Sequence, residues 1–246
     1  MKYGRIIVEG WTDAYFIHQL ICKRFSGLLT PQYDSPSGFR YPVEKDDQDE
    51  MFAFKGQLDP SVAVEILTNG GSSKEDVLTG LLRDESGLAR QFSACIVFDA
   101  DFPQRGSRAA TGNGGFAKAS ATFAGIAAKN VGSAPGLLRH PADVFLFPNN
   151  REDGMIETLL RRMAIDKAAV YFDECWPMFM EKIRFCEAKR SLSLKTELLD
   201  YVEVRGRKIG ERKCFLQNLT NDDLWDYSSP ALEPLVSFLD NFIRRL

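Results

Sequence analysis

Five acidic residues lie where predicted strands give way to turns or helices, and carboxylates in that arrangement can hold a divalent cation. Glu9 ends the first apolar run, Asp99 and Asp101 end another, and Asp13 and Glu157 lie near the starts of two predicted helices. Two carboxylates about 5 Å apart repel by roughly 3 kcal/mol at an effective dielectric near 20. A group of three or four must therefore take up protons or bind a cation. An isolated Asp-x-Asp more often caps a turn, and that alternative stays open for Asp99 and Asp101.

The other residue types decide which cation such a site would take. The chain has two histidines, His18 and His140, and five cysteines that are scattered without a close pair. This pattern argues against a zinc site and against an imidazole-rich site, so oxygen ligands and Mg²⁺ or Mn²⁺ are expected. His18 lies among apolar residues of a predicted helix, where a structural role is the more common one.

The cysteines also bear on the compartment. Free, scattered thiols are typical of a reducing environment. The sequence enters an apolar strand at once without signal-peptide architecture, and it has no apolar run of the roughly 18 residues that a membrane span needs. We therefore expect a cytoplasmic protein without a membrane segment.

The elements that position the acids follow a regular order. Predicted strands at 5–8, 63–67, 94–98 and 144–147 are continuous apolar runs that alternate with predicted helices. The helices are expected after a cap at Thr12, after Ser72 or Ser73, over 116–129, from near Gly154, and over 234–246. This order predicts an α/β fold, with a parallel sheet of about four strands flanked by helices. Ligands of such sheets bind at the carboxyl ends of the strands, and strand alternation would put Asp99 and Asp101 on one side.

Two regions fall outside this order. Residues 31–60 contain four prolines and a cluster of acids, and we expect an irregular insertion there. Residues 164–246 show no strand alternation and predict a mainly helical C-terminal extension, packed on a core of residues 1–163. The last helix of that extension is predicted to be amphipathic.

The charge distribution is uneven although the net charge is only −3. From Lys182 to Lys213, ten lysines and arginines face five acids, which leaves +5. Such a stretch is compatible with a polyanionic partner, although a solvated helix face is the more common cause. Near the Asp pair, Arg105, Arg108 and Lys118 are the candidates for binding phosphate. The glycine-rich loop before Lys118 lacks the Gly-Lys-Ser/Thr order of a P-loop.

Three segments together resemble the Toprim superfamily over about the first 160 residues. Val8–Asp13, with the sequence Val-Glu-Gly-Trp-Thr-Asp, resembles the first Toprim motif. Val97–Pro103 resembles the Asp-x-Asp motif. Gly154–Glu157 resembles a Gly-x-x-Glu found in small stand-alone bacterial Toprim proteins related to the overcoming-lysogenization-defect nucleases. The resemblance implies a Toprim or Rossmann-like core.

The same resemblance implies roles for single residues. In Toprim enzymes the residue that matches Glu9 is a general acid or base in phosphoryl transfer, and those that match Asp99 and Asp101 coordinate magnesium. In the nuclease branch the acids that match Asp13 and Glu157 help to hold a second ion. The chain lacks the additional domains of topoisomerases and bacterial primases, so those activities are not expected.

Two functions of different kinds are compatible with these residues. The leading hypothesis is a Mg²⁺- or Mn²⁺-dependent nuclease, or a related phosphodiester-cleaving enzyme, acting on DNA or RNA. The alternative is a non-catalytic or partner-dependent Toprim module that works with an ATPase, since many nuclease Toprim domains are joined to one or encoded beside one. A role in phage defence would fit either hypothesis and rests on the resemblance alone.

Overall fold

The computed structural model of the protein describes residues 2–32, 52–70, 75–83, 92–104, 111–134, 136–165, 170–185, 194–205 and 218–246. The chain divides into two compact units. The first comprises residues 1–155 together with 233–246, and the second comprises residues 156–232. The second unit is thus inserted in sequence between two parts of the first.

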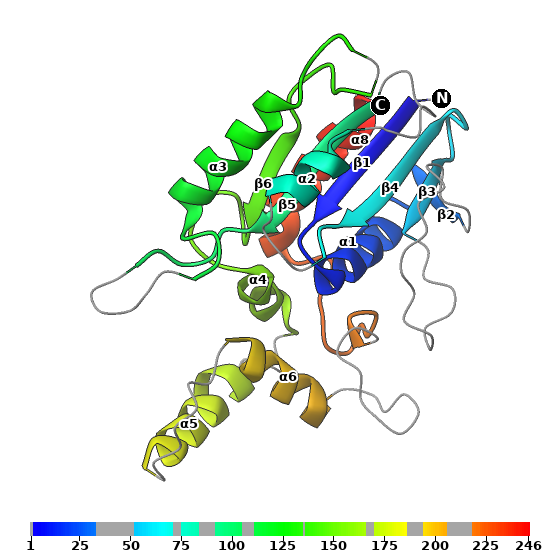
Figure 1. The fold of residues 1–246 in the computed structure, drawn as a ribbon. Helices are drawn as coiled ribbons and strands as arrows, with labels where there is room; N and C mark the ends of the chain where they lie inside the picture. The colour runs from blue at the N-terminus through cyan, green and yellow to red at the C-terminus, as the bar shows by residue number, and fades with distance from the viewer. Residues whose placement is uncertain are drawn as a thin grey trace. The chain divides into compact units, whose positions relative to one another are not determined.

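A six-stranded sheet forms the centre of the first unit, in the order β2-β3-β4-β1-β5-β6 (Figure 1). Its strands are β1 (Lys2–Val8), β2 (Leu29–Gln32), β3 (Ala53–Gly56), β4 (Val62–Thr68), β5 (Phe92–Asp99) and β6 (Asp143–Phe147). Strand β1 is parallel to both of its neighbours, β4 and β5, and β5 is parallel to β6. The predicted α/β class with a mainly parallel sheet is confirmed.

The predicted number of strands was wrong, because the sheet has six strands instead of about four. The two strands that were not predicted, β2 and β3, pair antiparallel with each other, and β3 pairs antiparallel with β4. Both are short and extend into residues 31–60, which were expected to be irregular. Strand β2 contains Pro31, a residue that sheets tolerate at an edge, where its missing N–H is not needed. Residues 33–51 lie outside the described residues.

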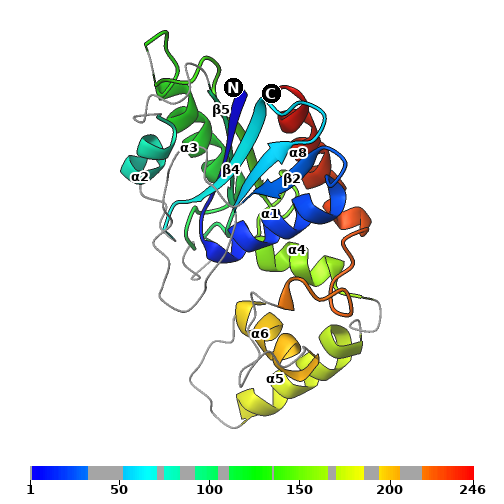
Figure 2. The same ribbon diagram turned by 90° about the vertical axis from the view of Figure 1, so that its right-hand side faces the viewer.

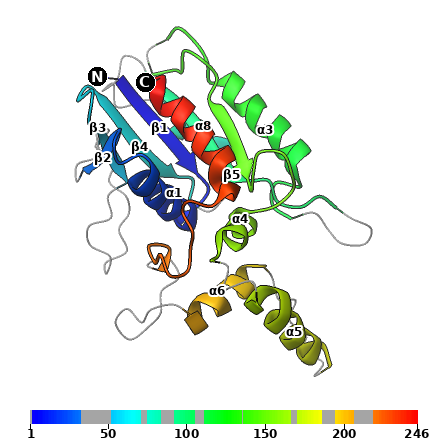
Figure 3. The same cartoon turned by 180° about the vertical axis from the view of Figure 1, so that it is seen from behind.

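Helices cover both faces of the sheet. Helices α1 (Trp11–Arg24) and α8 (Glu233–Arg244) lie on one face, and α2 (Glu75–Leu81) and α3 (Phe116–Lys129) lie on the other (Figures 2 and 3). The bounds of α3 match the predicted 116–129. Helix α1 begins after Gly10 and not after a Thr12 cap, and only Glu9 and Gly10 separate it from β1.

Each face has its own apolar core. On the side of α1 and α8, Phe16 packs edge-on against Phe147, with ring centroids 6.2 Å apart, and Phe145 contacts Phe238 of α8 at 5.3 Å. Gly4 permits this packing, since a Cβ there would lie 2.6 Å from Cδ1 of Leu246. On the other side, Phe98 of β5 contacts Phe123 of α3, with centroids 4.8 Å apart. Burial of these rings fixes the strands and therefore the positions of their carboxyl ends.

The second unit is helical. It contains α4 (Ile156–Met163), the π-helical turn η2 (Tyr171–Cys175), α5 (Trp176–Phe185), α6 (Leu194–Arg205) and the 3₁₀ turn η3 (Pro230–Leu232). Tyr201 is central to its core and lies 5.0 Å from Phe172 and 5.6 Å from Trp225 between ring centroids. In the described parts of either unit, no helix has the length and apolar character that crossing a membrane requires.

Candidate active site at the carboxyl edge of the sheet

The two central strands bring Glu9 and Asp99 to the same edge. Val8 of β1 pairs with Val97 of β5, so Glu9 stands at the register position of Phe98, one residue before Asp99. Neighbouring strands lie about 4.8 Å apart, and both acids are partly exposed while Oε2 of Glu9 is shielded from solvent. The ends of two strands that are far apart in the sequence thus lie next to each other at one edge of the sheet.

Asp13 stabilises the turn between β1 and α1. Its Oδ2 accepts a hydrogen bond of 2.8 Å from the backbone N–H of Gly10, and its side chain is buried. This is the reciprocal half of a capping box, in which an acid in the first helical turn binds back to the residue that precedes the helix. Asp13 therefore holds the backbone that follows Glu9.

Asp101 takes a different path from the one that strand alternation predicted. Its φ of +60° lies in the left-handed region, which Asp and Asn tolerate better than most residues, and β5 ends at Asp99. The expectation that Asp99 and Asp101 share one side of a continuous strand is therefore wrong. The backbone of Asp101 instead forms an isolated antiparallel bridge to Gly154, with hydrogen bonds of 2.7 and 2.9 Å.

Asn113 joins the two aspartates, although it was not among the residues predicted from the sequence. Its backbone N–H donates to Oδ2 of Asp101 at 2.7 Å, and its side-chain Nδ2 donates to the backbone carbonyl of Asp99 at 2.7 Å. Gly112 is required beside it, because a Cβ there would lie 2.1 Å from Oδ2 of Asp101. An asparagine between glycines after an Asp-x-Asp is the signal that could have indicated this loop.

A further acid that was not predicted from the sequence, Asp153, fixes the start of α3. Its Oδ1 accepts a hydrogen bond of 2.8 Å from the N–H of Phe116, one of the amides that a helix leaves without an internal partner. Two turns of chain on this edge, the one before α3 and the one around Gly154, are thereby tied together.

The cationic candidates differ in what the structure shows of them. Lys118 is exposed on the first turn of α3, and its side chain lies across Gly114, whose ideal Cβ position is 3.2 Å from the lysine Nζ. Arg105 and Arg108 lie outside the described residues. Glu157 is buried in the first turn of α4 and belongs to the second unit, so it is described there by itself.

The acids at this edge do not form a closed cage of ligands. Within the described ranges, no three His, Cys, Asp or Glu residues come together in a way that would hold a metal ion. The arrangement offers oxygen donors from Glu9 and Asp99 at a partly exposed edge, with Asp101 tied to the loop of Asn113. Such an edge can bind a cation only together with water or with a ligand that supplies further oxygens.

His18 has a structural position. Its ring lies 5.2 Å from that of Phe54 and 5.9 Å from that of Phe52, and burial lowers its pKa to about 4. It is neutral at physiological pH and packs as an aromatic residue in α1. The described cysteines, Cys22, Cys95 and Cys175, are free thiols.

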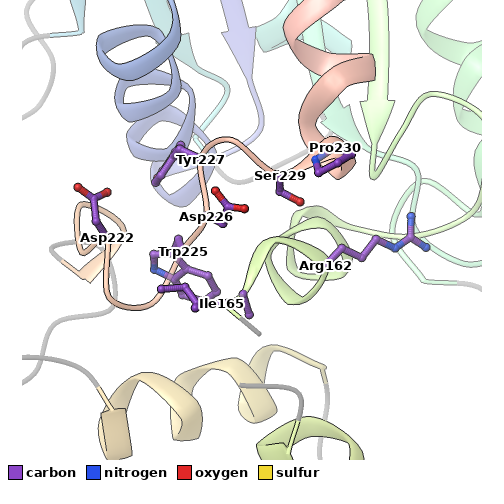
Figure 4. A pocket seen from close by; sticks show the side chains of 9 residues that line it. Arg162, Ile165, Asp222, Trp225, Asp226, Tyr227, Ser229 and Pro230 are labelled. Atoms are coloured by element: carbon purple, nitrogen blue, oxygen red, sulfur yellow. The ribbon is translucent and has the colours of Figure 1, made fainter. Parts of the chain in front are cut away.

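The second unit contains a pocket of about 450 Å³ that includes none of the predicted site residues. It lies beside the paired segments 163–165 and 224–226, where Asp226 N–H donates to the Met163 carbonyl at 2.7 Å. Figure 4 shows Arg162 and Asp222 at opposite sides of it, with Trp225 and Ile165 between them. No sequence pattern indicated this pocket, because its walls come from segments more than one helix apart in the chain.

Comparisons with known proteins identify no family for this chain. No protein-family model matches it, and no curated protein matches it. One solved structure, the crystal structure of a hypothetical protein from Pyrococcus horikoshii OT3, is similar over 100% of this chain and 95% of its own, with 14% sequence identity and a TM-score of 0.48. A function for the chain can therefore be inferred only from the site itself.

Proposed function

We propose that this chain is a magnesium- or manganese-dependent enzyme of the Toprim type that cleaves phosphodiester bonds in nucleic acid. The observation that supports the proposal is the register of β1 and β5, which brings the strand ends that carry Glu9 and Asp99 to neighbouring positions at the carboxyl edge of the sheet. Two acids on neighbouring parallel strands repel each other, and a cation between them relieves that repulsion.

The donor set fits Mg²⁺ or Mn²⁺ with substrate bound. Magnesium usually keeps several of its waters and binds through one or two carboxylates plus the phosphates of its substrate. Asp99 would supply a protein oxygen, and the absence of a three-residue ligand group among the described residues is compatible with that mode. When bound, the ion would neutralise phosphate charge and make a water molecule more acidic.

The remaining chemistry belongs to the residues of the chain. Glu9 would accept the proton of the attacking water, because its carboxylate lies at the edge with one oxygen shielded from solvent. Asp13 would keep Glu9 in place through the Gly10 amide. The exposed ammonium of Lys118 would attract a flanking phosphate, in the manner of a point charge.

Cleavage by the purified protein tests the proposal. Labelled single- and double-stranded DNA and RNA are incubated with the protein in Mg²⁺, in Mn²⁺ and in EDTA. We expect metal-dependent cleavage, and we expect Glu9→Gln and Asp99→Asn to slow it by about 10²- to 10⁴-fold. Glu75→Gln is the matched control, because Glu75 is an exposed acid of α2 that pairs with Lys129 at 2.9 Å.

Two results would contradict the proposal. One is the absence of metal-dependent cleavage on every substrate of the panel. The other is cleavage by the Glu9→Gln variant at the rate of the unsubstituted protein, which would show that the activity comes from elsewhere.

A further inference from the structure

Two aromatic side chains are exposed beside the candidate acids. Trp11 follows Glu9 by two residues, Phe102 follows Asp101 directly, and each is 37% exposed. Single exposed apolar residues are common on protein surfaces. These two differ from scattered ones because they follow the carboxyl ends of neighbouring strands, close in sequence to the candidate acids.

The backbone of Phe102 is held on both sides. Its N–H donates to Oγ1 of Thr111 at 3.1 Å, and its carbonyl accepts from the N–H of Thr111 at 3.0 Å. The preceding residue, Asp101, is bridged to Gly154. The exposed ring is therefore presented from a fixed backbone, which reduces the entropy lost when a ligand packs on it.

Trp11 is equally well supported. It is the first residue of α1, and its indole contacts the ring of Phe52 with centroids 5.7 Å apart. Phe52 is itself buried and contacts Tyr15 edge-on at 5.5 Å. One part of the indole thus rests on Phe52, while the remainder is exposed to solvent.

The chemistry of this rim fits unpaired nucleobases. Aromatic side chains bind single-stranded nucleic acid by stacking on bases, and every base has a face available for stacking. In a duplex those faces are already stacked on each other. The exposed Lys118 adds positive charge on the same edge of the sheet, which suits a phosphate backbone between stacked bases.

We propose that Trp11 and Phe102 are substrate-positioning residues that stack on the bases of single-stranded nucleic acid and so select that form over duplex. The inference rests on the proposed function, because it names the substrate form of the same site. It adds a binding step that does not require the metal, and this step can be measured separately.

The test measures binding in EDTA, where no metal-dependent cleavage can occur. A labelled oligothymidylate and a duplex of the same length are titrated with the protein, and anisotropy reports the dissociation constants. We expect tighter binding of the single strand, weakened about fivefold to tenfold by Trp11→Ala and by Phe102→Ala. Trp11→Phe should restore most of the affinity, because a phenyl ring still stacks. Thermal unfolding checks that each variant is folded.

Leu58→Ala is the matched control for loss of an exposed apolar side chain. Leu58 is 82% exposed and precedes β4, so it lies at the amino edge of the sheet, opposite the site. Its replacement should leave oligothymidylate binding unchanged.

The outcomes separate this inference from the proposed function. If the protein cleaves nucleic acid through Glu9 while Trp11→Ala and Phe102→Ala bind oligothymidylate like the unsubstituted protein, the inference is overturned and the function stands. Equal or tighter binding of the duplex also overturns it. So does the finding that a partner protein covers both rings and that its binding displaces no nucleic acid. If the protein binds single strands through both rings but cleaves nothing, the inference stands and the function fails.

Discussion

Strand β1 carries two groups of ionisable side chains, and they differ in how their charges are balanced. In the interior of the strand, Arg5 lies opposite Glu65 of β4 in the register, and Tyr3 donates a hydrogen bond to Glu65. Arg5 also donates to the carbonyls of Leu81 and Arg83, at 3.1 and 2.6 Å. At the carboxyl end of the strand, Glu9 follows β1 where Asp99 ends the neighbouring strand β5.

The difference separates a charge group with a structural role from the group to which we assign the proposed function. The interior group contains a positive and a negative side chain, is almost fully buried, and makes its hydrogen bonds with other groups of the protein. Burial and the charge of Glu65 raise the pKa of Tyr3. The group at the strand end contains only negatively charged side chains, and it lies at a partly exposed edge. Buried charges must be paired to persist, whereas like charges at an open edge have room for a cation and a substrate.

Removing Arg5 should have the largest effect on stability. Arg5→Met leaves Glu65 as an uncompensated buried charge, and we expect a loss of about 3 kcal/mol in the free energy of unfolding. Glu9→Gln should change that free energy by less than about 0.5 kcal/mol or raise it, because it relieves repulsion between acids. Urea unfolding of both variants measures the contrast.

The double variant Arg5→Met, Glu65→Gln is the control for that experiment. It removes both charges. Its loss in the free energy of unfolding should be smaller than the sum of the losses in Arg5→Met and Glu65→Gln. A comparable loss of stability in Arg5→Met and Glu9→Gln would erase the distinction between the two groups.

His18 extends the comparison to a half-buried ionisable group that packs mainly against aromatic rings. Since its pKa is lowered to about 4, the folded protein prefers the neutral ring. The stability that this provides is complete above the unfolded pKa of about 6.5 and is lost as the pH falls from there towards 4. We expect a loss of about 2 kcal/mol over that window, which His18→Phe should remove.

Urea unfolding at several pH values measures this effect. His140→Phe is the matched control, because His140 is an exposed histidine. If the free energy of unfolding depends on pH in His18→Phe as it does in the unsubstituted protein, the assignment is contradicted.

Variants of Asp101 test whether this residue mainly stabilises the loop or mainly contributes to the proposed cleavage. Asp101→Asn keeps an oxygen that accepts from the Asn113 amide and keeps a residue that tolerates positive φ. It should preserve stability within about 0.5 kcal/mol, whereas Asp101→Ala should cost about 1 kcal/mol. We expect Asp101→Asn to slow cleavage less than Asp99→Asn does; a larger effect would make Asp101 the principal ligand.

The smallest effect is expected in the second unit, at Glu197. Burial raises its pKa against the lowering effect of Arg161, whose guanidinium lies 3.8 Å away, and Asp173 raises it further. A raised carboxyl pKa means that stability is greatest at low pH and is lost as the pH rises through that pKa. Glu197→Gln should therefore give a small gain in unfolding temperature at neutral pH and none in acid, unlike the exposed Glu174→Gln.

The sequence predicted the parts of the fold that rest on continuous apolar runs. Strands β1, β4, β5 and β6 have that pattern, and α3 has clear helical spacing, so their existence and order could be inferred. Strands β2 and β3 could not, because each has only four residues and their pairing joins segments separated by a proline-rich stretch. Amphipathic spacing indicated that α8 covers a surface, but spacing does not say which one.

For the candidate site, the sequence predicted which strand ends are neighbours. That Glu9 and Asp99 follow two adjacent parallel strands could be inferred from strand order alone. The conformation of Asp101 does not, because the turn is set by hydrogen bonds to Gly154 and Asn113, which are distant in sequence. The capping of α3 by Asp153 could not be predicted for the same reason.

The return of the chain to the first unit through α8 has a consequence for biosynthesis. The ribosome makes β6 first, then the whole second unit, and only then the helix that contacts β6 through Phe238. During that interval Phe145 lacks its contact with Phe238. A nascent chain in this condition is a client for chaperones, since uncovered apolar surface promotes aggregation.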